Sequence, residues 1–170
     1  MDKVLIKGNS LYPPTLELLC GIPGAGKSTY AAQFPGALVL NRDTYRELLT
    51  GLKPEEMKYY YSEDFSTEKF YYEKLITNMV NTQIKYPAPW VKHIIVDQTN
   101  MSLDTIINFW DIRKVDQITI FNVDLQTAIN RDSARARHVG IKVIQSMYDR
   151  MQRLIPEIEE AVDINKIKYV

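Results

Sequence analysis

A glycine-rich stretch between an apolar run and a helical pattern constrains this 170-residue chain more than any other feature. Residues 21–29 read Gly-Ile-Pro-Gly-Ala-Gly-Lys-Ser-Thr, after the apolar run at Thr15–Cys20 and before a helical pattern over Thr29–Phe34. Glycines let backbone N–H groups curl around an anion, and a helix N-terminus adds positive potential. The spacing G-x-x-x-x-G-K-[ST] in a strand–loop–helix setting is typical of the phosphate-binding P-loop. The sequence therefore predicts a site for a nucleoside triphosphate.

The residue types in this loop suit a triphosphate with its metal ion. Lys27 can reach the β- and γ-phosphates, and the hydroxyl of Ser28 can bind Mg²⁺. Nucleotide contacts are predicted for Gly21, Pro23, Gly24, Ala25, Gly26, Lys27, Ser28 and Thr29.

Short apolar runs alternate with helical patterns along the chain. Strands are predicted at Leu16–Cys20, Ala37–Leu40, His93–Val96 and Ile118–Val123. Buried helical stripes are predicted at Tyr72, Leu75, Ile76, Met79 and Val80, at Leu103, Ile106, Ile107 and Trp110, and at Ile144, Met147, Tyr148 and Met151. Pro87 and Pro89 are expected to end the first of these helices and Pro156 the last. The pattern predicts an α/β fold with a mostly parallel sheet covered by helices on both faces.

Length and composition suit one globular domain spanning residues 1–170. Val4–Lys7 and Ile164–Val170 are candidate extra strands that the sequence does not place, so oligomerisation through the tail stays open. The chain has zero net charge, which argues against a general nucleic-acid coat protein. No secretory signal peptide is expected, because the first residues lack its apolar core and cleavage site, and no apolar run approaches membrane-spanning length. The single cysteine, Cys20, is expected to be buried. One cysteine cannot form an internal disulfide, which suits a reducing cytoplasm.

Polar residues follow the second predicted strand, at the sheet edge where ligands of parallel sheets bind. Asp43 suits the N-cap of the next helix, but its carboxylate could equally accept a proton from an attacking hydroxyl. Arg46 lies three residues further on and could hold an anionic substrate on the same side of the helix. The two uses of Asp43 are compatible.

The third predicted strand ends in an acid, Asp97, which has the loose form of a Walker B element that orders Mg²⁺. Gln98, Thr99 and Asn100 then offer amide and hydroxyl groups at the same edge. The alternative is a polar turn that caps the helix beginning at Leu103.

Arginines gather near the end of a predicted helix before Gly140. Arg131 and Arg135 share a face at i, i+4, and Arg137 follows. An arginine carried by a mobile lid can stabilise the charge that develops during phosphoryl transfer. The alternative is that these are ordinary surface residues.

Together these segments resemble the 5′-hydroxyl kinase domain of the phage and repair polynucleotide kinases. The resemblance covers roughly Leu16–Ile155 and rests on blocks in the same order. They are G-x-P-G-x-G-K-S-T at Gly21–Thr29, N-R-D-x-Y-R at Asn41–Arg46, T-N at Thr99-Asn100, R-x-S-x-R at Arg131–Arg135, and V-x-x-S-M-Y-x-x-M at Val143–Met151.

The resemblance implies an ATP-dependent kinase for nucleic-acid 5′-hydroxyl ends, working with Mg²⁺ in the cytoplasm of a bacterium or phage-infected cell. It makes Lys27 and Ser28 the ATP and Mg²⁺ residues, Asp43 the general base, and Arg46 the ligand of the acceptor phosphate. Arg135 would be the lid arginine on the ATP phosphates, with Arg131 beside it. The family places an essential acid near Thr99, which is here Asp97, and Thr99 and Asn100 would lie beside the acceptor. The D-x-D-G-T phosphatase signature often fused to this kinase is not in the sequence, which implies a protein with kinase activity alone.

Two other interpretations stay open. A P-loop kinase for a small hydroxyl acceptor, such as a nucleotide, sugar or antibiotic, would use the same base and lid. A nucleotide-binding switch that hydrolyses slowly would need the P-loop alone, although the guanine-reading N-K-x-D motif is missing from the sequence.

Overall fold

The computed structural model describes residues 13–62, 65–135 and 138–170. They form a five-stranded sheet, with order β2-β3-β1-β4-β5, in which every neighbouring pair is parallel. This confirms the parallel α/β fold. The strands are β1 Thr15–Cys20, β2 Leu38–Asn41, β3 His93–Asp97, β4 Gln117–Ile120 and β5 Ile167–Tyr169.

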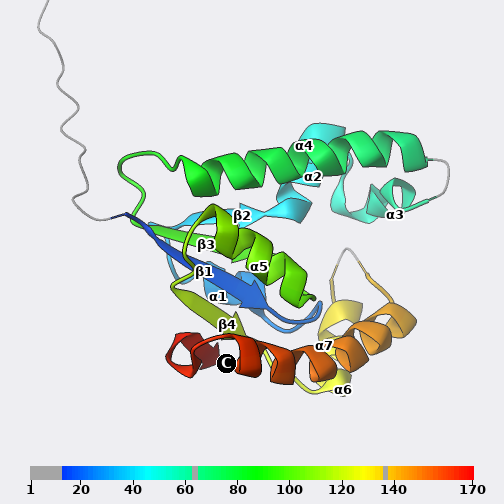
Figure 1. Cartoon of the computed structure of the whole chain (residues 1–170). Coiled ribbons are helices and arrows are strands. Elements are labelled where there is room, and N and C mark those ends of the chain that lie inside the picture. Colours follow the sequence, from blue (N-terminus) through cyan, green and yellow to red (C-terminus); the bar gives the residue numbers. More distant parts are fainter. Residues whose placement is uncertain (1–12, 63–64, 136–137) are drawn as a thin grey trace, which may run out of the picture.

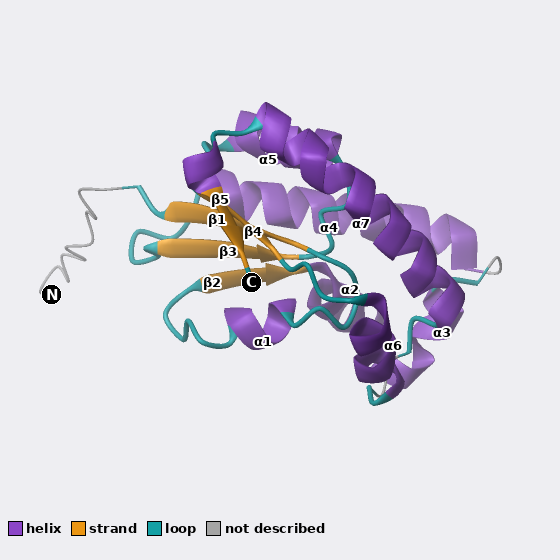
Figure 2. Cartoon of the chain, turned by 90° about the horizontal axis from the view of Figure 1, so that it is seen from below, coloured by secondary structure: helices purple, strands orange, loops and turns teal. Residues whose placement is uncertain are grey.

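Helices cover both faces of the sheet (Figures 1 and 2). In the edge-on view, α1 lies on one face, and α4, α5 and α7 lie on the other. Among the described residues, no helix has both the length and the apolar character that crossing a membrane requires. The helices are α1 Lys27–Ala31, α2 Arg42–Thr50, α3 Met57–Tyr60, α4 Ser66–Lys85, α5 Leu103–Ile112, α6 Leu125–Ser133 and α7 Ile141–Ala161, with 3₁₀ turns at Pro54–Glu56 and Ile164–Lys166.

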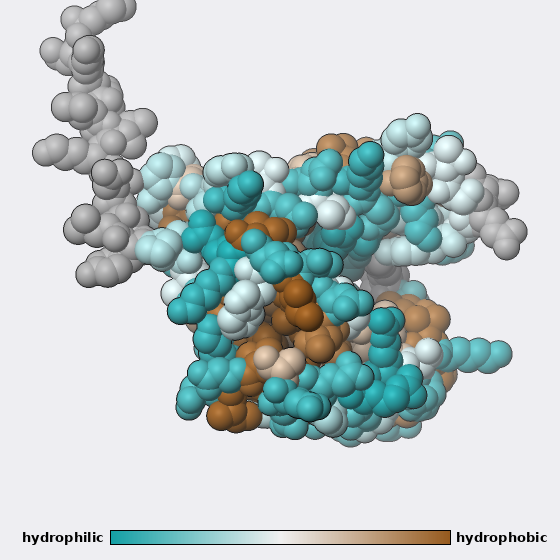
Figure 3. Space-filling model, in the orientation of Figure 1, coloured by the Kyte–Doolittle hydropathy of each residue, from teal (hydrophilic) through white to brown (hydrophobic). Residues whose placement is uncertain are grey.

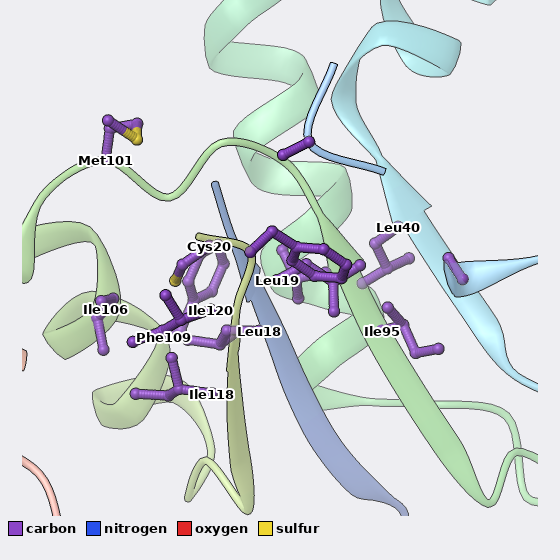
Figure 4. Close-up of a cluster of buried hydrophobic side chains, with 14 of the residues drawn as sticks. Leu18, Leu19, Cys20, Leu40, Ile95, Met101, Ile106, Phe109, Ile118 and Ile120 are labelled. Carbon is purple, nitrogen blue, oxygen red and sulfur yellow. The ribbon is translucent and has the colours of Figure 1, made fainter. Parts of the chain in front are cut away.

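The central strand β1 is buried on both faces, which explains its continuous apolar run. Leu18 pairs with Val96 of β3 on one side and with Ile118 of β4 on the other. Figure 4 shows these strands contributing side chains to one cluster with Ile106 and Phe109 of α5. This core fixes the carboxyl ends of β1, β2 and β3 side by side.

One carboxylate is buried in this apolar strand. Glu17 of β1 is 3% exposed, and its carboxylate accepts hydrogen bonds from Tyr30 (2.9 Å) and Gln117 (3.0 Å). Thr119 donates a third hydrogen bond at 2.5 Å, and His93 lies 3.1 Å away. A buried charge is tolerated only when it is well paired, so these contacts keep the strand stable.

Two helical stripes are narrower than the sequence pattern predicts. In α4 the buried residues are Ile76, Val80 and Ile84, whereas Leu75 is 46% exposed. In α5 the buried residues include Phe109, and Ile107 is 47% exposed. Each helix packs into the core along one line of residues spaced by three or four, so an apolar residue beside that line faces solvent.

The prediction that Pro156 ends the last helix is wrong, because α7 continues to Ala161. Proline removes one N–H donor from the helix. Leu154 and Ile158 are buried on either side of it, so packing of this face outweighs the lost hydrogen bond. Pro87 and Pro89 do follow the end of α4 at Lys85, as predicted.

The C-terminal tail completes the sheet. β5 pairs in parallel with β4, with Ile167 opposite Ile118, so the tail is an edge strand. β4 itself ends at Ile120 rather than at Val123, because Asp124 caps α6 and the chain must leave the sheet before it. The candidate strand Val4–Lys7 lies outside the described residues.

Candidate active site

The glycine-rich loop joins β1 to α1 and adopts a backbone that requires glycine. Gly24 has φ 79° and Gly26 has φ 100°, both in the left-handed region that side chains disfavour. A Cβ atom on Gly24 would lie 2.5 Å from the carbonyl oxygen of Ala128 in α6. The loop is therefore shaped to expose its backbone, and it packs against the helix that carries Arg131.

Replacing Gly24 with alanine is expected to destabilise the protein by about 2–5 kcal/mol, from about 1–2 for the left-handed backbone and about 1–3 for the clash. Gly51 has φ 70° but open space around its Cα, so Gly51→Ala should cost only about 1–2 kcal/mol. Urea unfolding gives the free energy of unfolding of both variants. The difference between their losses is the contribution of the clash with Ala128. Equal losses in the two variants would contradict the close approach of the loop to α6.

Lys27 is buried under this loop, with 9% of the residue exposed. Its ammonium donates to the carbonyl oxygens of Gly21 (2.8 Å) and Ile22 (2.9 Å). Burial lowers the pKa of Lys27 to about 8, although the nearby charge of Asp97 opposes the shift. The charges of Asp43 and Arg135 also act on this pKa, so both groups lie near the loop.

The predicted burial of Cys20 is confirmed, because the residue is fully buried at the end of β1. Burial raises the pKa of its thiol to about 12. A thiol with such a pKa stays protonated at neutral pH and is unreactive.

The residues predicted to bind metal lie in direct contact. The hydroxyl of Ser28 donates to Oδ2 of Asp97 at 2.8 Å, and Asp97 is 4% exposed. The amide of Asn41 donates to the same oxygen at 2.8 Å. Within residues 13–62, 65–135 and 138–170 no three His, Cys, Asp or Glu side chains group as a metal cage. A hydroxyl with one carboxylate fits Mg²⁺, which commonly takes its remaining ligands from phosphates and water.

The start of α2 corrects one prediction. The N-cap is Asn41, whose Oδ1 accepts hydrogen bonds from the backbone N–H groups of Asp43 (2.9 Å) and Thr44 (3.1 Å). Asp43 is therefore not the cap, because β2 extends to Asn41 and the helix begins immediately afterwards. The side chain of Asp43 is 44% exposed and lies in the first turn of α2, where it lines the same cleft as Lys27.

Arg46 pairs with Asp43 as the spacing suggested, but its main support comes from α4. Its Nη1 contacts Asp43 Oδ1 at 2.5 Å, and its Nε and Nη2 donate to the two oxygens of Glu73 at 2.6 and 3.0 Å. Glu73 also accepts from Arg42 (2.7 Å) and from the hydroxyl of Tyr60 (2.7 Å). Sequence reasoning missed Glu73. Its signal was an acid three residues before Ile76, on the apolar stripe of α4.

Glu73 is expected to make stability depend on pH. Burial opposes its ionisation, but hydrogen bonds from Arg46, Arg42 and Tyr60 outweigh burial and lower the pKa of Glu73 from 4.5 to about 2. A carboxylate with a lowered folded pKa stabilises the protein above pH 4.5, and this contribution is lost as pH falls towards 2. Unfolding free energies of wild type and Glu73→Gln should therefore differ most at pH 7 and converge as the pH falls from 4.5 towards 2. A difference that stays constant over this range would contradict the prediction.

The segment after β3 is hydrogen-bonded to β1. Asn100 has φ 46° and is 2% exposed, and its amide donates to the carbonyl oxygen of Leu19 at 2.8 Å. Gln98 donates to Oδ1 of Asn100 at 2.6 Å. Thr99 and Asn100 both line the cleft, but the side chain of Asn100 is committed to the backbone of β1. The alternative of a cap formed by this turn is wrong, because Ser102 caps α5.

The two arginines after β4 lie beside the P-loop. Arg131 on α6 donates to the carbonyl oxygen of Gly24 at 3.3 Å. α6 ends at Ser133, so Arg135 follows the helix rather than sharing its last turn. Both residues line the cleft, and Arg137 lies outside the described residues.

These groups line one cleft of about 1740 Å³ at the carboxyl ends of the strands. Figure 3 shows this face hollowed between the side that carries α3 and α4 and the side that carries α6 and α7. The P-loop, Asp43 with Arg46, Asp97, Thr99 and the two arginines thus meet around a single space. Such an arrangement can hold a triphosphate at one end and a second substrate at the other.

Comparisons with known proteins agree with this geometry. The chain resembles a chain of the Pnkp1/Rnl/Hen1 RNA repair complex with a TM-score of 0.67 and 24% identity, covering 85% of this chain and 46% of that one. A second Pnkp1/Rnl/Hen1 complex gives a TM-score of 0.53 and 25% identity, covering 78% of this chain and 44% of that one. The chain spans less than half the length of these two relatives.

A third similar structure is a small-substrate kinase. Deoxyadenosine kinase from M. mycoides with bound dATP gives a TM-score of 0.55 and 17% identity, covering 92% of this chain and 90% of that one, which shows a shared fold. A family model described as an AAA domain, AAA_33, matches residues 16–155, which is most of the chain. The chain therefore belongs to the AAA_33 family of AAA domains and has the fold of the P-loop kinases.

Proposed function

We propose that this chain, acting as a single domain, transfers the γ-phosphate of ATP to the 5′-hydroxyl end of DNA or RNA. The P-loop kinase fold implies nucleotide binding. Beyond nucleotide binding, the proposal names the acceptor of the phosphoryl group and assigns roles to the residues that line the cleft.

The proposal depends mainly on the pairing of Asp43 with Arg46. Both side chains project from the first turns of α2, at the carboxyl end of β2, and both line the cleft that holds Lys27. A guanidinium has five N–H donors, of which contacts to Asp43 and Glu73 use three. A carboxylate able to take a proton thus lies beside an arginine that can still bind a phosphate group.

In the proposed reaction, Asp43 accepts the proton of the 5′-hydroxyl as that oxygen forms a bond to the γ-phosphorus. The bond between the γ-phosphorus and the β,γ-bridging oxygen breaks, and ADP leaves with that electron pair. Lys27 and Arg135 stabilise the negative charge that spreads over the transferring group. Arg46 holds the acceptor strand through the phosphate next to the reacting nucleotide.

ATP would be held by the loop from Gly21 to Thr29 and by Arg131, with Mg²⁺ near Ser28 and Asp97. When bound, the metal ion supplies positive charge that neutralises the phosphates. The contact of Ser28 with Asp97 places a hydroxyl and a carboxylate beside the loop, which supports this assignment.

Two observations favour a nucleic-acid end as the acceptor. The matches that cover most of this chain at 24–25% identity are with an RNA repair complex. The cleft wall beside Asp43 also carries cations, Arg46 and Lys58, that suit a phosphodiester strand. A chain without net charge can act on such ends, because a few phosphate contacts suffice to hold one strand terminus.

The test is an assay with labelled ATP, Mg²⁺ and 5′-hydroxyl oligonucleotides of DNA and of RNA, with nucleosides and sugars as competing acceptors. Label at the oligonucleotide end supports the proposal. Transfer to small hydroxyl compounds alone would instead favour the alternative that the fold of deoxyadenosine kinase suggests. ATP binding without transfer to any acceptor would favour a nucleotide-binding switch.

A further inference from the structure

The structure separates one aromatic residue from the tyrosine- and phenylalanine-rich segments 59–61 and 70–72. Tyr60 is fully buried, whereas Tyr59, Phe70 and Tyr71 are 50%, 66% and 69% exposed and do not line the cleft. Tyr61 is 47% exposed and does line it, together with Lys58. Tyr61 therefore keeps about half of its surface open to the cleft, where a planar group of a ligand can reach the ring.

The ring of Tyr61 rests on the same support as Arg46. It meets the buried ring of Tyr60 edge-on, with centroids 5.2 Å apart and an interplanar angle of 81°. The hydroxyl of Tyr60 donates to Glu73, and Glu73 holds Arg46 with both carboxylate oxygens. The aromatic ring and the guanidinium are therefore linked through Tyr60 and Glu73.

The guanidinium of Arg46 and the ring of Tyr61 line the same cleft. Burial lowers the pKa of Arg46, but its hydrogen bond with Glu73 and the charges of Glu73 and Asp43 outweigh burial and raise it. The ammonium of Lys69 lies 5.1 Å from the centroid of the Tyr61 ring. The ring thus has one cation against it and shares the cleft with Lys58 and Arg46, whose charges a polyanionic strand can pair with.

We propose that Tyr61 stacks on the base of the acceptor's 5′-terminal nucleotide and so selects nucleic-acid ends over small hydroxyl compounds. The inference rests on the proposed function. A nucleotide presents its 5′-oxygen, its base and its 3′-phosphate in three directions from one sugar. Asp43, Tyr61 and Arg46 provide a proton acceptor, an aromatic face and a guanidinium for these three groups along one wall of the cleft.

The experiment compares two 5′-hydroxyl oligonucleotides that differ only at the terminal residue, which carries a base in one and a tetrahydrofuran abasic sugar in the other. Loss of base stacking is expected to raise the acceptor KM about five- to hundredfold in wild type. Tyr61→Ala should raise KM for the base-bearing acceptor by a similar factor and abolish the difference between the two acceptors. The kcat and the KM for ATP should stay within about threefold, because stacking adds affinity without touching the transferring group.

Two further variants test whether the aromatic ring and its position in the cleft are responsible for the effect. Tyr61→Phe keeps the ring, so it should retain the preference for a base. Tyr59→Ala removes a similarly exposed tyrosine two residues earlier, in α3 and outside the cleft, and it should behave as wild type. The inference would be overturned if Tyr61→Ala still discriminated between base-bearing and abasic ends, or if its KM rose equally for both acceptors. Either result would leave the proposal of end phosphorylation intact. Failure of the wild type to phosphorylate any oligonucleotide would overturn both proposals.

Discussion

Replacing Asp43 with asparagine is expected to lower the kcat of phosphoryl transfer by about 10²–10⁴-fold, the usual contribution of a general base. Asparagine has nearly the same shape and can still accept the hydrogen bond that Arg46 makes to Oδ1 at 2.5 Å. It cannot take up a proton at neutral pH. Because the N-cap of α2 is Asn41, the helix should form as in wild type.

The measurement is single-turnover transfer to a saturating 5′-hydroxyl oligonucleotide, with ATP affinity determined separately by calorimetry. ATP affinity is expected to change by less than about threefold, since the base acts on the acceptor alone. Glu47→Gln is the matched control, because this acid lies on the same helix and does not line the cleft. A kcat for Asp43→Asn within tenfold of wild type would remove Asp43 from the catalytic role.

The second large effect is expected at Lys27. Lys27→Met should lower kcat/KM for ATP by about 10²–10³-fold, as removal of a charge-stabilising donor does in other active sites. The ammonium donates to the carbonyl oxygens of Gly21 and Ile22, which hold it directly under the glycine-rich loop. Methionine has a similar length but cannot donate, so transfer should fail even where the loop folds normally.

Lys58→Met serves as the control for a general loss of positive charge, because Lys58 lines the same cleft from α3. It should change the acceptor KM by less than about tenfold and leave ATP kinetics near wild type. A loss of ATP kinetics in Lys58→Met equal to that in Lys27→Met would show that net charge, rather than the position of the Lys27 ammonium, governs binding.

The sequence predicts those parts of the fold that depend on neighbouring residues. The P-loop and strands β1 to β4 follow from short local patterns, since consecutive residues determine both a glycine turn and a short apolar strand. The sequence also predicts which residues follow β2 and β3. Because the two strands are parallel neighbours, their carboxyl ends lie at the same edge of the sheet.

The features that sequence reasoning missed depend on contacts between distant elements. Glu73 supports Arg46 from 27 positions further along the chain, and only packing of α4 on α2 brings them together. The N-cap at Asn41 depends on where β2 ends, and the continuation of α7 through Pro156 depends on burial of Leu154 and Ile158. Local propensity cannot report such energies, which arise only in the folded chain.

The amide of Asn41 touches both halves of the cleft. Its oxygen caps α2, the helix of Asp43 and Arg46, while its nitrogen donates to the Asp97 oxygen that also receives Ser28. Any adjustment of Ser28 and Asp97 when a nucleotide arrives therefore reaches the first turn of α2 through one side chain. The two substrates should consequently bind with thermodynamic coupling, so that saturation with one shifts the dissociation constant of the other.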